Sequence, residues 1–264
     1  MLQLQMLYAS HTLCPIIRFD IMHNVYHGGC GSDLAASVII ECCLENNFGA
    51  GDLATQLRRA HFAHCSWLKQ TGWAASNGSP KQFTRGRFNY TRNKDQATMT
   101  TRYKAAHVKT VCIWLHVVAA ANVDSEYKRL RAACCYALST WITLLDSAPL
   151  LLSDAQVTEA QRLGYLFLRS YQRLAAESLI LGKTLYKIRP KFHAFEHTIE
   201  NLANKENPRY FSCFLDEDLM GKVARVAGKC HPFTMMERCL TRKAEMLDER
   251  WTAKAKSMAD ARAD

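Results

Sequence analysis

SDAQVTEAQRLGYLFLRSYQRLAAESLILGKTLYK, residues 153–187, carries apolar side chains at helical spacing over its whole length. Ser153 followed by Asp154 is the pattern of a helix N-cap. The same periodicity predicts helices over 101–122 and 124–146, with Pro149 between two of the helices. We therefore expect 101–187 to pack as a helical bundle. The predicted bundle core consists of Val111, Leu115, Leu138, Leu145 and Leu166.

Shorter elements are predicted on both sides of this block. Residues 14–22, CPIIRFDIM, are apolar and predict a short buried strand. Helices are predicted over 32–44, capped by Ser32, and from Asp52 to residue 68, and 74–98 has loop composition without an apolar period. Pro190 opens a predicted helix that runs to residue 204, 209–215 predicts a second strand, and further helices are predicted over 216–229 and 234–258.

Composition narrows the class of protein. The chain has 264 residues, of which 48% are hydrophobic, which is enough to bury the core of one large domain or of a small domain with an insertion. The longest apolar run, 111–122, is too short and too polar at its edges to span a bilayer. The first ten residues lack the pattern of a secretion signal, so we expect the cytosol or the nucleus and no membrane. The eleven cysteines are odd in number and include the adjacent pairs Cys42-Cys43 and Cys134-Cys135 in apolar helical stretches, which indicates reduced core residues. They form no CxxC pair, which argues against zinc ribbons and thioredoxin-type redox motifs.

A basic segment links the predicted N-terminal helices to the predicted helical bundle. Residues 81–109 hold eight Lys or Arg and one acid, so they account for most of the net charge of +10, and aromatic residues are interleaved. Cations that neutralise phosphates, next to rings that stack on bases, are typical of nucleic-acid-binding surfaces. The predicted contacts with DNA or RNA are Lys81, Arg85, Arg87, Phe88, Tyr90, Arg92, Lys94, Arg102 and Lys104. A solvated linker is the alternative of equal weight.

Two patterns place histidines where a metal ion could bind. In DIMHN, residues 20–24, Asp20 ends the predicted strand and His23 follows in an acid-x-x-His spacing. A carboxylate at a strand end suits Mg²⁺, but the favoured alternative is that Asp20 caps the next turn and His23 fills a polar niche. His193 and His197 are four residues apart and share one face of a helix, which suits a metal ion, a phosphate or ordinary packing.

A third pattern is acidic. Asp216, Glu217 and Asp218 stand together at the start of a predicted helix. The helix macrodipole alone explains acids at this position. The functional interpretation is that one of these acids shares a metal ion with Asp20, and Glu217 is the preferred candidate.

Together these patterns resemble the C-terminal half of cut-and-paste DNA transposases, nearest to the CACTA (En/Spm-like) group, with related arrangements in the hAT group. The resemblance covers residues 14–230 and rests on the acid-x-x-His element of Asp20 and His23, the long helical block, the Pro-Lys-x-His-x3-His sequence of 190–197 and the acids of 216–218. It implies a mainly α fold with a few short strands, the remnant of a ribonuclease-H-like α/β core that carries a large helical insertion. The implied parts are 1–73, a partial core; 74–100, the basic loop; 101–189, the helical insertion; and 190–264, the rest of the core with a terminal helix.

The resemblance also implies a site. The catalytic residues would be Asp20, Asp216, Glu217 and Asp218, and the metal ligands Asp20, Glu217, His23, His193 and His197, with a weakly held Mg²⁺ or other divalent ion. The first catalytic Asp of these enzymes lies on an earlier strand, and no acid precedes Cys14, so two-metal phosphoryl transfer would be incomplete.

We therefore expect a transposase-derived nucleic-acid-binding protein that does not cleave DNA as an isolated chain. A homo-oligomer or a partner chain could complete its site. The alternative is a non-catalytic helical domain that binds other proteins and has no nucleic-acid role.

Overall fold

A computed structural model describes residues 18–73, 81–90 and 96–214, together with scattered single positions between 224 and 252. The chain divides into two units, Met1–Ser212 and Cys213–Asp264. Within the second unit, the hydroxyls of Thr241 and Thr252 each donate to a backbone carbonyl four residues earlier, as they do in a helix. The rest of the description concerns the first unit.

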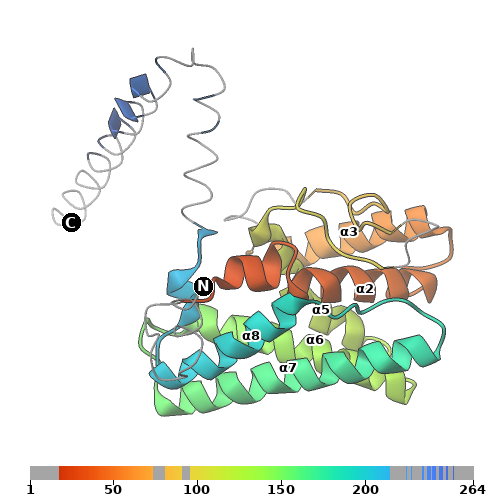
Figure 1. Cartoon of the computed structure of the whole chain (residues 1–264). Helices are drawn as coiled ribbons and strands as arrows, with labels where there is room; N and C mark the ends of the chain where they lie inside the picture. Colours follow the sequence, from red (N-terminus) through yellow and green to blue (C-terminus); the bar gives the residue numbers. More distant parts are fainter. Residues whose placement is uncertain are drawn as a thin grey trace, which may run out of the picture. The chain divides into compact units, whose positions relative to one another are not determined.

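The described part of the first unit is helical (Figure 1). Its elements are the π-helical turn η1 (Met22–Tyr26), the α-helices α2 (Cys30–Leu44), α3 (Leu53–Thr71), α5 (Ala105–Ala120), α6 (Glu126–Ser147), α7 (Asp154–Ile180) and α8 (Pro190–Asn201), and the 3-10 turns η2 (Leu202–Asn204) and η3 (Pro208–Phe211). Among the described residues, β-pairing is limited to an isolated antiparallel bridge between Leu151 and Glu206. The prediction of a mainly helical fold is confirmed. None of the described helices combines the length and apolar character needed to cross a bilayer.

The bundle forms as predicted, from α5, α6 and α7. Ser153 and Gln156 make a reciprocal capping box at the start of α7, in which each side chain accepts from the other residue's backbone N–H, at 3.3 and 2.9 Å. Four of the five predicted core residues are buried, whereas Leu166 is half-buried. Helix α7 ends at Ile180, earlier than predicted, because Gly182 takes a left-handed φ of 71° and closes a Schellman motif with the Lys183 N–H bonded to the Ser178 carbonyl.

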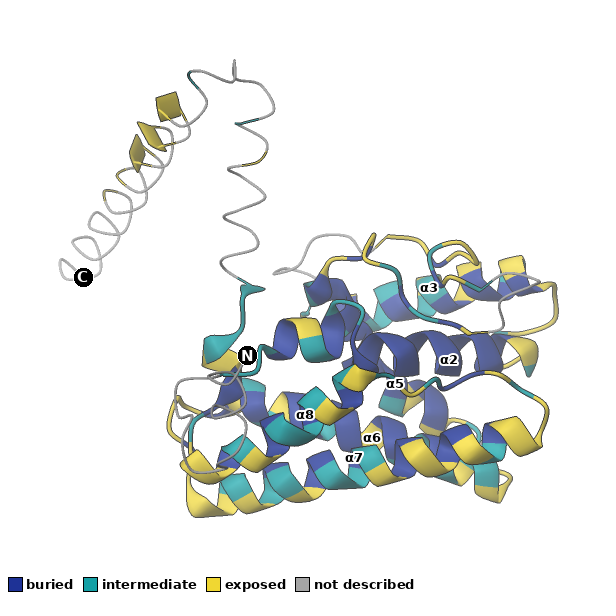
Figure 2. Cartoon of the chain, in the orientation of Figure 1, coloured by how far each residue is buried: buried dark blue, intermediate teal, exposed yellow. Residues whose placement is uncertain are grey.

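Helix α2 is the buried centre of the unit. Every residue from Cys30 to Cys43 is buried, and Figure 2 shows the helix in the buried colour along most of its length. A helix that is apolar on all sides packs against neighbours on all sides, here α3, α5 and η1. Its N-cap is Gly29, where a Cβ would lie 2.1 Å from the Asn24 carbonyl oxygen. Ser32, the predicted cap, lies inside the helix, and its hydroxyl donates to the Tyr26 carbonyl.

Neither predicted strand is present in the described residues. Residues 14–17 lie outside the description, 18–20 have no regular structure, and the chain is helical from Ile21. The Asp20 carboxylate accepts from the Met22 N–H at 2.9 Å. The backbone carbonyl of Asp20 accepts from the Asn24 N–H at 3.0 Å, and together these bonds start the turn. Likewise, 208–211 form η3 instead of a strand. Short apolar runs of this kind occur equally in strands and in buried helical turns, so the pattern alone was insufficient.

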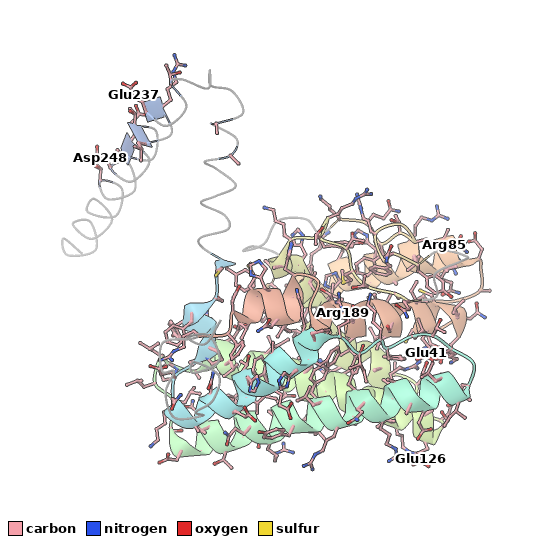
Figure 3. All side chains as sticks on the ribbon, in the orientation of Figure 1. Glu41, Arg85, Glu126, Arg189, Glu237 and Asp248 are labelled. Carbon is pink, nitrogen blue, oxygen red and sulfur yellow. The ribbon has the colours of Figure 1, made fainter. Side chains whose placement is uncertain are left out.

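A buried ionic network joins α2 to α6 and to the segment after α7. The Arg131 side chain is 0% exposed and donates to Glu41 at 3.0 Å and to both carboxylate oxygens of Glu45 at 2.9 Å. The Glu41 carboxylate also accepts from the Lys183 ammonium and the Tyr186 hydroxyl, both at 2.5 Å (Figure 3 labels Glu41). These contacts fix the register of three segments that are far apart in the sequence.

Candidate functional site

Three of the four Phe and Tyr residues of the basic segment point into the protein. Phe83, Phe88 and Tyr103 are buried and contact one another with ring centroids 5.2–6.3 Å apart. The prediction that Phe88 stacks on nucleic-acid bases is therefore wrong for this structure, because the ring is 0% exposed. Its apolar surface has a place in the core, and burial there is more favourable than exposure at a wet surface.

The ring of Phe83 also stacks on His64 of α3, with centroids 5.8 Å apart. His64 is buried and lies 5.2 Å from the Trp114 ring. Burial, helped by the nearby His61 and His107, lowers the pKa of His64 to about 3. His64 is therefore neutral at physiological pH and serves as part of the platform under the basic segment.

Backbone hydrogen bonds hold the two described arms of the basic segment together. Thr98 N–H donates to the Phe88 carbonyl at 2.9 Å, and Thr100 N–H donates to the Arg87 carbonyl at 2.8 Å. Met99 N–H donates to the carbonyl of Ser32 on α2, at 3.2 Å. The arms 81–90 and 96–104 are thus attached to each other and to the core, which contradicts the solvated-linker interpretation for these residues.

The cations of the segment remain at the surface. Lys81, Arg85, Arg102 and Lys104 are exposed, and none of them forms an ion pair with an acid of the described residues (Figure 3 labels Arg85). Lys81 instead donates to the Arg102 carbonyl at 3.0 Å. Arg87 is half-buried and donates to the Gln82 carbonyl at 2.8 Å, and Tyr90 is half-buried. Arg92 and Lys94 lie outside the described residues.

Some cations elsewhere in the first unit have acidic partners, whereas Arg58, Arg59, Lys69, Arg129 and Arg169 are exposed and form no ion pair with a described acid. On or beside the bundle helices the pairs are Lys109 with Asp146, Arg162 with Glu159, Arg173 with Glu126 and Glu177, and Lys205 with Asp154. The described arms of the basic segment, 81–90 and 96–104, hold five Lys or Arg and no acid, so positive charge is dense on this segment.

Asp20 and His23 form a local pair at the start of η1. The Asp20 carboxylate accepts from the Met22 N–H and contacts His23 Nδ1. Capping of the following turn, the alternative predicted for Asp20, is thus present. Lys191 of α8 donates to the carbonyls of His23 and His27 at 2.8 and 3.0 Å, so the turn that carries the pair is attached to the helix that carries the other two predicted histidines.

His193 and His197 lie one turn apart on α8 and face each other. Their Nε2 atoms are 3.0 Å apart and their ring centroids 4.2 Å apart. On the other side of each ring, His193 Nδ1 lies 3.3 Å from a Glu196 carboxylate oxygen and His197 Nδ1 lies 2.7 Å from one of Glu200. The Phe19 ring stacks on His197 with centroids 5.6 Å apart and an interplanar angle of 17°.

Sequence reasoning placed Glu196 off the helix face of the two histidines and did not consider Glu200. The available signal was the His-x-x-Glu spacing, which occurs twice in succession in HAFEHTIE, residues 193–200. Asp216, Glu217 and Asp218 lie outside the described residues, so their convergence with Asp20 stays a prediction. The structure does bring the Asp20 segment and the α8 histidines into one neighbourhood, through the contacts of Phe19 and Lys191.

Comparison of the chain with protein-family models, with curated proteins and with solved structures finds no match. The resemblance to transposases therefore rests on short motifs and on no similarity over the length of the chain. Function must be inferred from the surface and side-chain geometry of the chain itself.

Proposed function

We propose that the chain binds nucleic acid through phosphate contacts made by the exposed cations of the basic segment. The observation that supports this most is the density of unpaired charge: the described arms, 81–90 and 96–104, hold five Lys or Arg and no acid, and the four exposed cations form no ion pair with a described acid. Unpaired surface cations gain most from a polyanion, because phosphates release their condensed counterions when the cations bind.

The burial of the aromatic rings defines the kind of binding. With Phe83, Phe88 and Tyr103 in the core and Tyr90 half-buried, the described segment presents charge with little exposed ring surface for stacking. Contacts to phosphates fix position on the backbone but carry no sequence information directly. We therefore expect binding with little base preference and a strong dependence on salt.

The cations are also held in place. Because the segment is bonded to α2 and packed on α3, its charged side chains start from an ordered backbone. Less conformational entropy is then lost on binding than from a free basic tail. Cleavage of nucleic acid stays a prediction of the transposase resemblance, and phosphate binding does not depend on it.

The test is a salt titration of binding to duplex DNA, followed by fluorescence anisotropy. The triple variant Arg85→Ala, Arg102→Ala, Lys104→Ala should flatten the slope of log K against log salt by about 0.9 for each phosphate that the variant no longer neutralises. The matched control removes three paired cations, Arg162→Ala, Arg173→Ala and Lys205→Ala, and should leave most of the slope.

Three results would reject the proposal. One is an unchanged slope in the triple variant of the basic segment. Another is an equal decrease of the slope in the control, which would mean that only net charge matters. The third is a wild-type chain without salt-dependent binding to DNA or RNA, in which case the interaction-domain alternative replaces the proposal. Titrations with single-stranded DNA and RNA probes of equal length then measure whether the site distinguishes these nucleic acids from duplex DNA.

A further inference from the structure

The geometry of α8 points to a second site. We propose that His193 and His197 bind one divalent transition-metal ion through their Nε2 atoms, with Glu196 and Glu200 orienting the two rings. The site is formed by residues of one helix, and none of them belongs to the basic segment. Metal binding here is therefore independent of nucleic-acid binding.

The neighbours of each ring decide which nitrogens carry protons. Each Nδ1 faces a carboxylate, at 3.3 Å for Glu196 and 2.7 Å for Glu200, and an ionised carboxylate only accepts hydrogen bonds. We therefore assign the Nδ1 atoms as the N–H donors. In the neutral rings, both Nε2 atoms then carry lone pairs, and the two atoms lie 3.0 Å apart. Such an arrangement is repulsive until a proton or a metal ion lies between them.

The distance between the two nitrogens selects the cation. Imidazole nitrogen binds a metal ion at about 2.0–2.1 Å, so two nitrogens 3.0 Å apart subtend roughly 91–97° at the ion. That angle is near the right angle of square-planar and octahedral ions and below the tetrahedral angle. It favours Ni²⁺ and Cu²⁺ over Zn²⁺, and imidazole ligands disfavour Mg²⁺.

The two rings are held in position before an ion binds. A helix places residues i and i+4 on one face, and paired histidines at this spacing are a known way to bind a metal ion. Carboxylates bonded to the far nitrogens fix the tautomer and raise the basicity of the ligands. Phe19 stacks on the His197 ring, and Lys191 ties the start of α8 to η1. The His193 side chain is 70% exposed and that of His197 31%, so an ion can enter from solvent.

The proposed site supplies two protein ligands. The other coordination positions are therefore open to water or to a ligand from another molecule. An open site of this kind can accept a substrate or a partner's side chain.

The test is calorimetric titration of the full chain with Ni²⁺ in a non-coordinating buffer. The single substitutions His193→Ala and His197→Ala should each remove one binding event, and Glu200→Gln should weaken it by about 10- to 100-fold at unchanged stoichiometry. Cu²⁺ bound to the wild-type chain should show electron paramagnetic resonance coupling to two nitrogens. Circular dichroism checks that the variants fold. Because the His193 side chain is exposed, its removal should leave the fold intact.

Two controls locate the ion. Glu159→Gln removes an exposed acid that pairs with Arg162 on α7 and should leave Ni²⁺ affinity unchanged. His23→Ala should also leave it unchanged. The proposal is overturned if the His193→Ala, His197→Ala double variant binds Ni²⁺ as the wild type does, if His23→Ala abolishes binding, or if the wild type does not bind Ni²⁺. An unchanged affinity in Glu200→Gln would reject the orienting role of the glutamates.

Discussion

Replacing Arg131 by Met tests whether the buried ionic network holds the unit together. The substitution keeps much of the apolar stem and removes a guanidinium that is 0% exposed. It deletes three charge-assisted hydrogen bonds, one to Glu41 and two to Glu45. Removal of one partner from a buried ion pair costs about 3–5 kcal/mol, because the remaining charge is left uncompensated.

The surroundings place the expected decrease in stability within that range. Glu41, 1% exposed, still accepts from Lys183, Tyr127 and Tyr186, so it keeps part of its compensation. Glu45 is less buried and regains some hydration. We therefore expect the free energy of unfolding to fall by about 3–4 kcal/mol, nearer the lower end of the range for breaking a buried pair.

The assay is urea unfolding followed by circular dichroism, with the midpoint and the slope fitted together. The control is Arg162→Met, which breaks an exposed pair with Glu159 and should cost about 1 kcal/mol or less. The reasoning is refuted if Arg131→Met costs no more than this control. Adding Glu41→Gln to Arg131→Met should recover part of the stability, because it removes the uncompensated charge.

The pH dependence of the same variant gives an independent check. Burial alone raises the pKa of the Glu41 carboxyl, but hydrogen bonds from Lys183 and Tyr186 and the charge of Arg131 outweigh it, so the pKa in the folded protein is lowered. A lowered carboxyl pKa stabilises the fold above the ordinary value of about 4.3 and loses this contribution as the pH falls through the folded value. Without Arg131 the folded pKa rises, so the deficit of the variant should shrink as the pH falls from the folded pKa of the variant toward the lower folded pKa of the wild type.

Three further substitutions test the core beneath the candidate sites. Phe88→Ala should reduce the free energy of unfolding by about 3–5 kcal/mol in urea, yet leave the salt slope of DNA binding unchanged in the folded variant; a flattened slope would place the ring in the interface. Burial lowers the pKa of His64 to about 3, so the free energy of unfolding of the wild type should fall by up to about 1.4 kcal/mol per pH unit as the pH drops from about 6.5 toward that value. The His64→Leu variant lacks this titration, so the difference in unfolding free energy between wild type and variant should change with pH in the same way. A constant difference across this pH range contradicts the reasoning. Gly164→Ala places a Cβ 2.6 Å from Ile199 Cγ1 and should cost about 1–3 kcal/mol by thermal unfolding, whereas Gly86→Ala meets open space and should be neutral; equal effects would argue against the close α7–α8 contact.

Much of the helical architecture was predictable because its signals are local. Ser153 and Asp52 cap α7 and α3 by accepting from N–H groups three residues later, and Pro190 occupies the first turn of α8. These interactions involve neighbours in the sequence, and they satisfy backbone groups that any helix start leaves unpaired. The positions of the candidate histidines on one face of α8 follow from the same local geometry.

The strands at 14–22 and 209–215 show where local information was insufficient. Ile21, Met22 and Tyr26 are buried, as the apolar pattern indicated, but a helical turn buries them as well as a strand does. With α2, α5 and α8 around η1, the described residues offer it no neighbouring strand with which to pair. Its backbone hydrogen bonds are instead made within its own turn.

The amino-acid sequence alone defined the charge of the basic segment, the helical period of the bundle and the four-residue spacing of His193 and His197. In the folded chain, Phe88 of the basic segment is buried and Arg85 is exposed. The reason is that burial of the apolar ring is favourable, whereas burial of the guanidinium would cost its hydration. The contacts of each α8 histidine with its glutamate and with the other histidine join residues three or four apart on one helix, so they follow from the sequence, whereas the stacking of Phe19 on His197 depends on the tertiary structure. Composition and period are properties of neighbours along the chain, whereas burial and side-chain direction depend on which distant segments pack together.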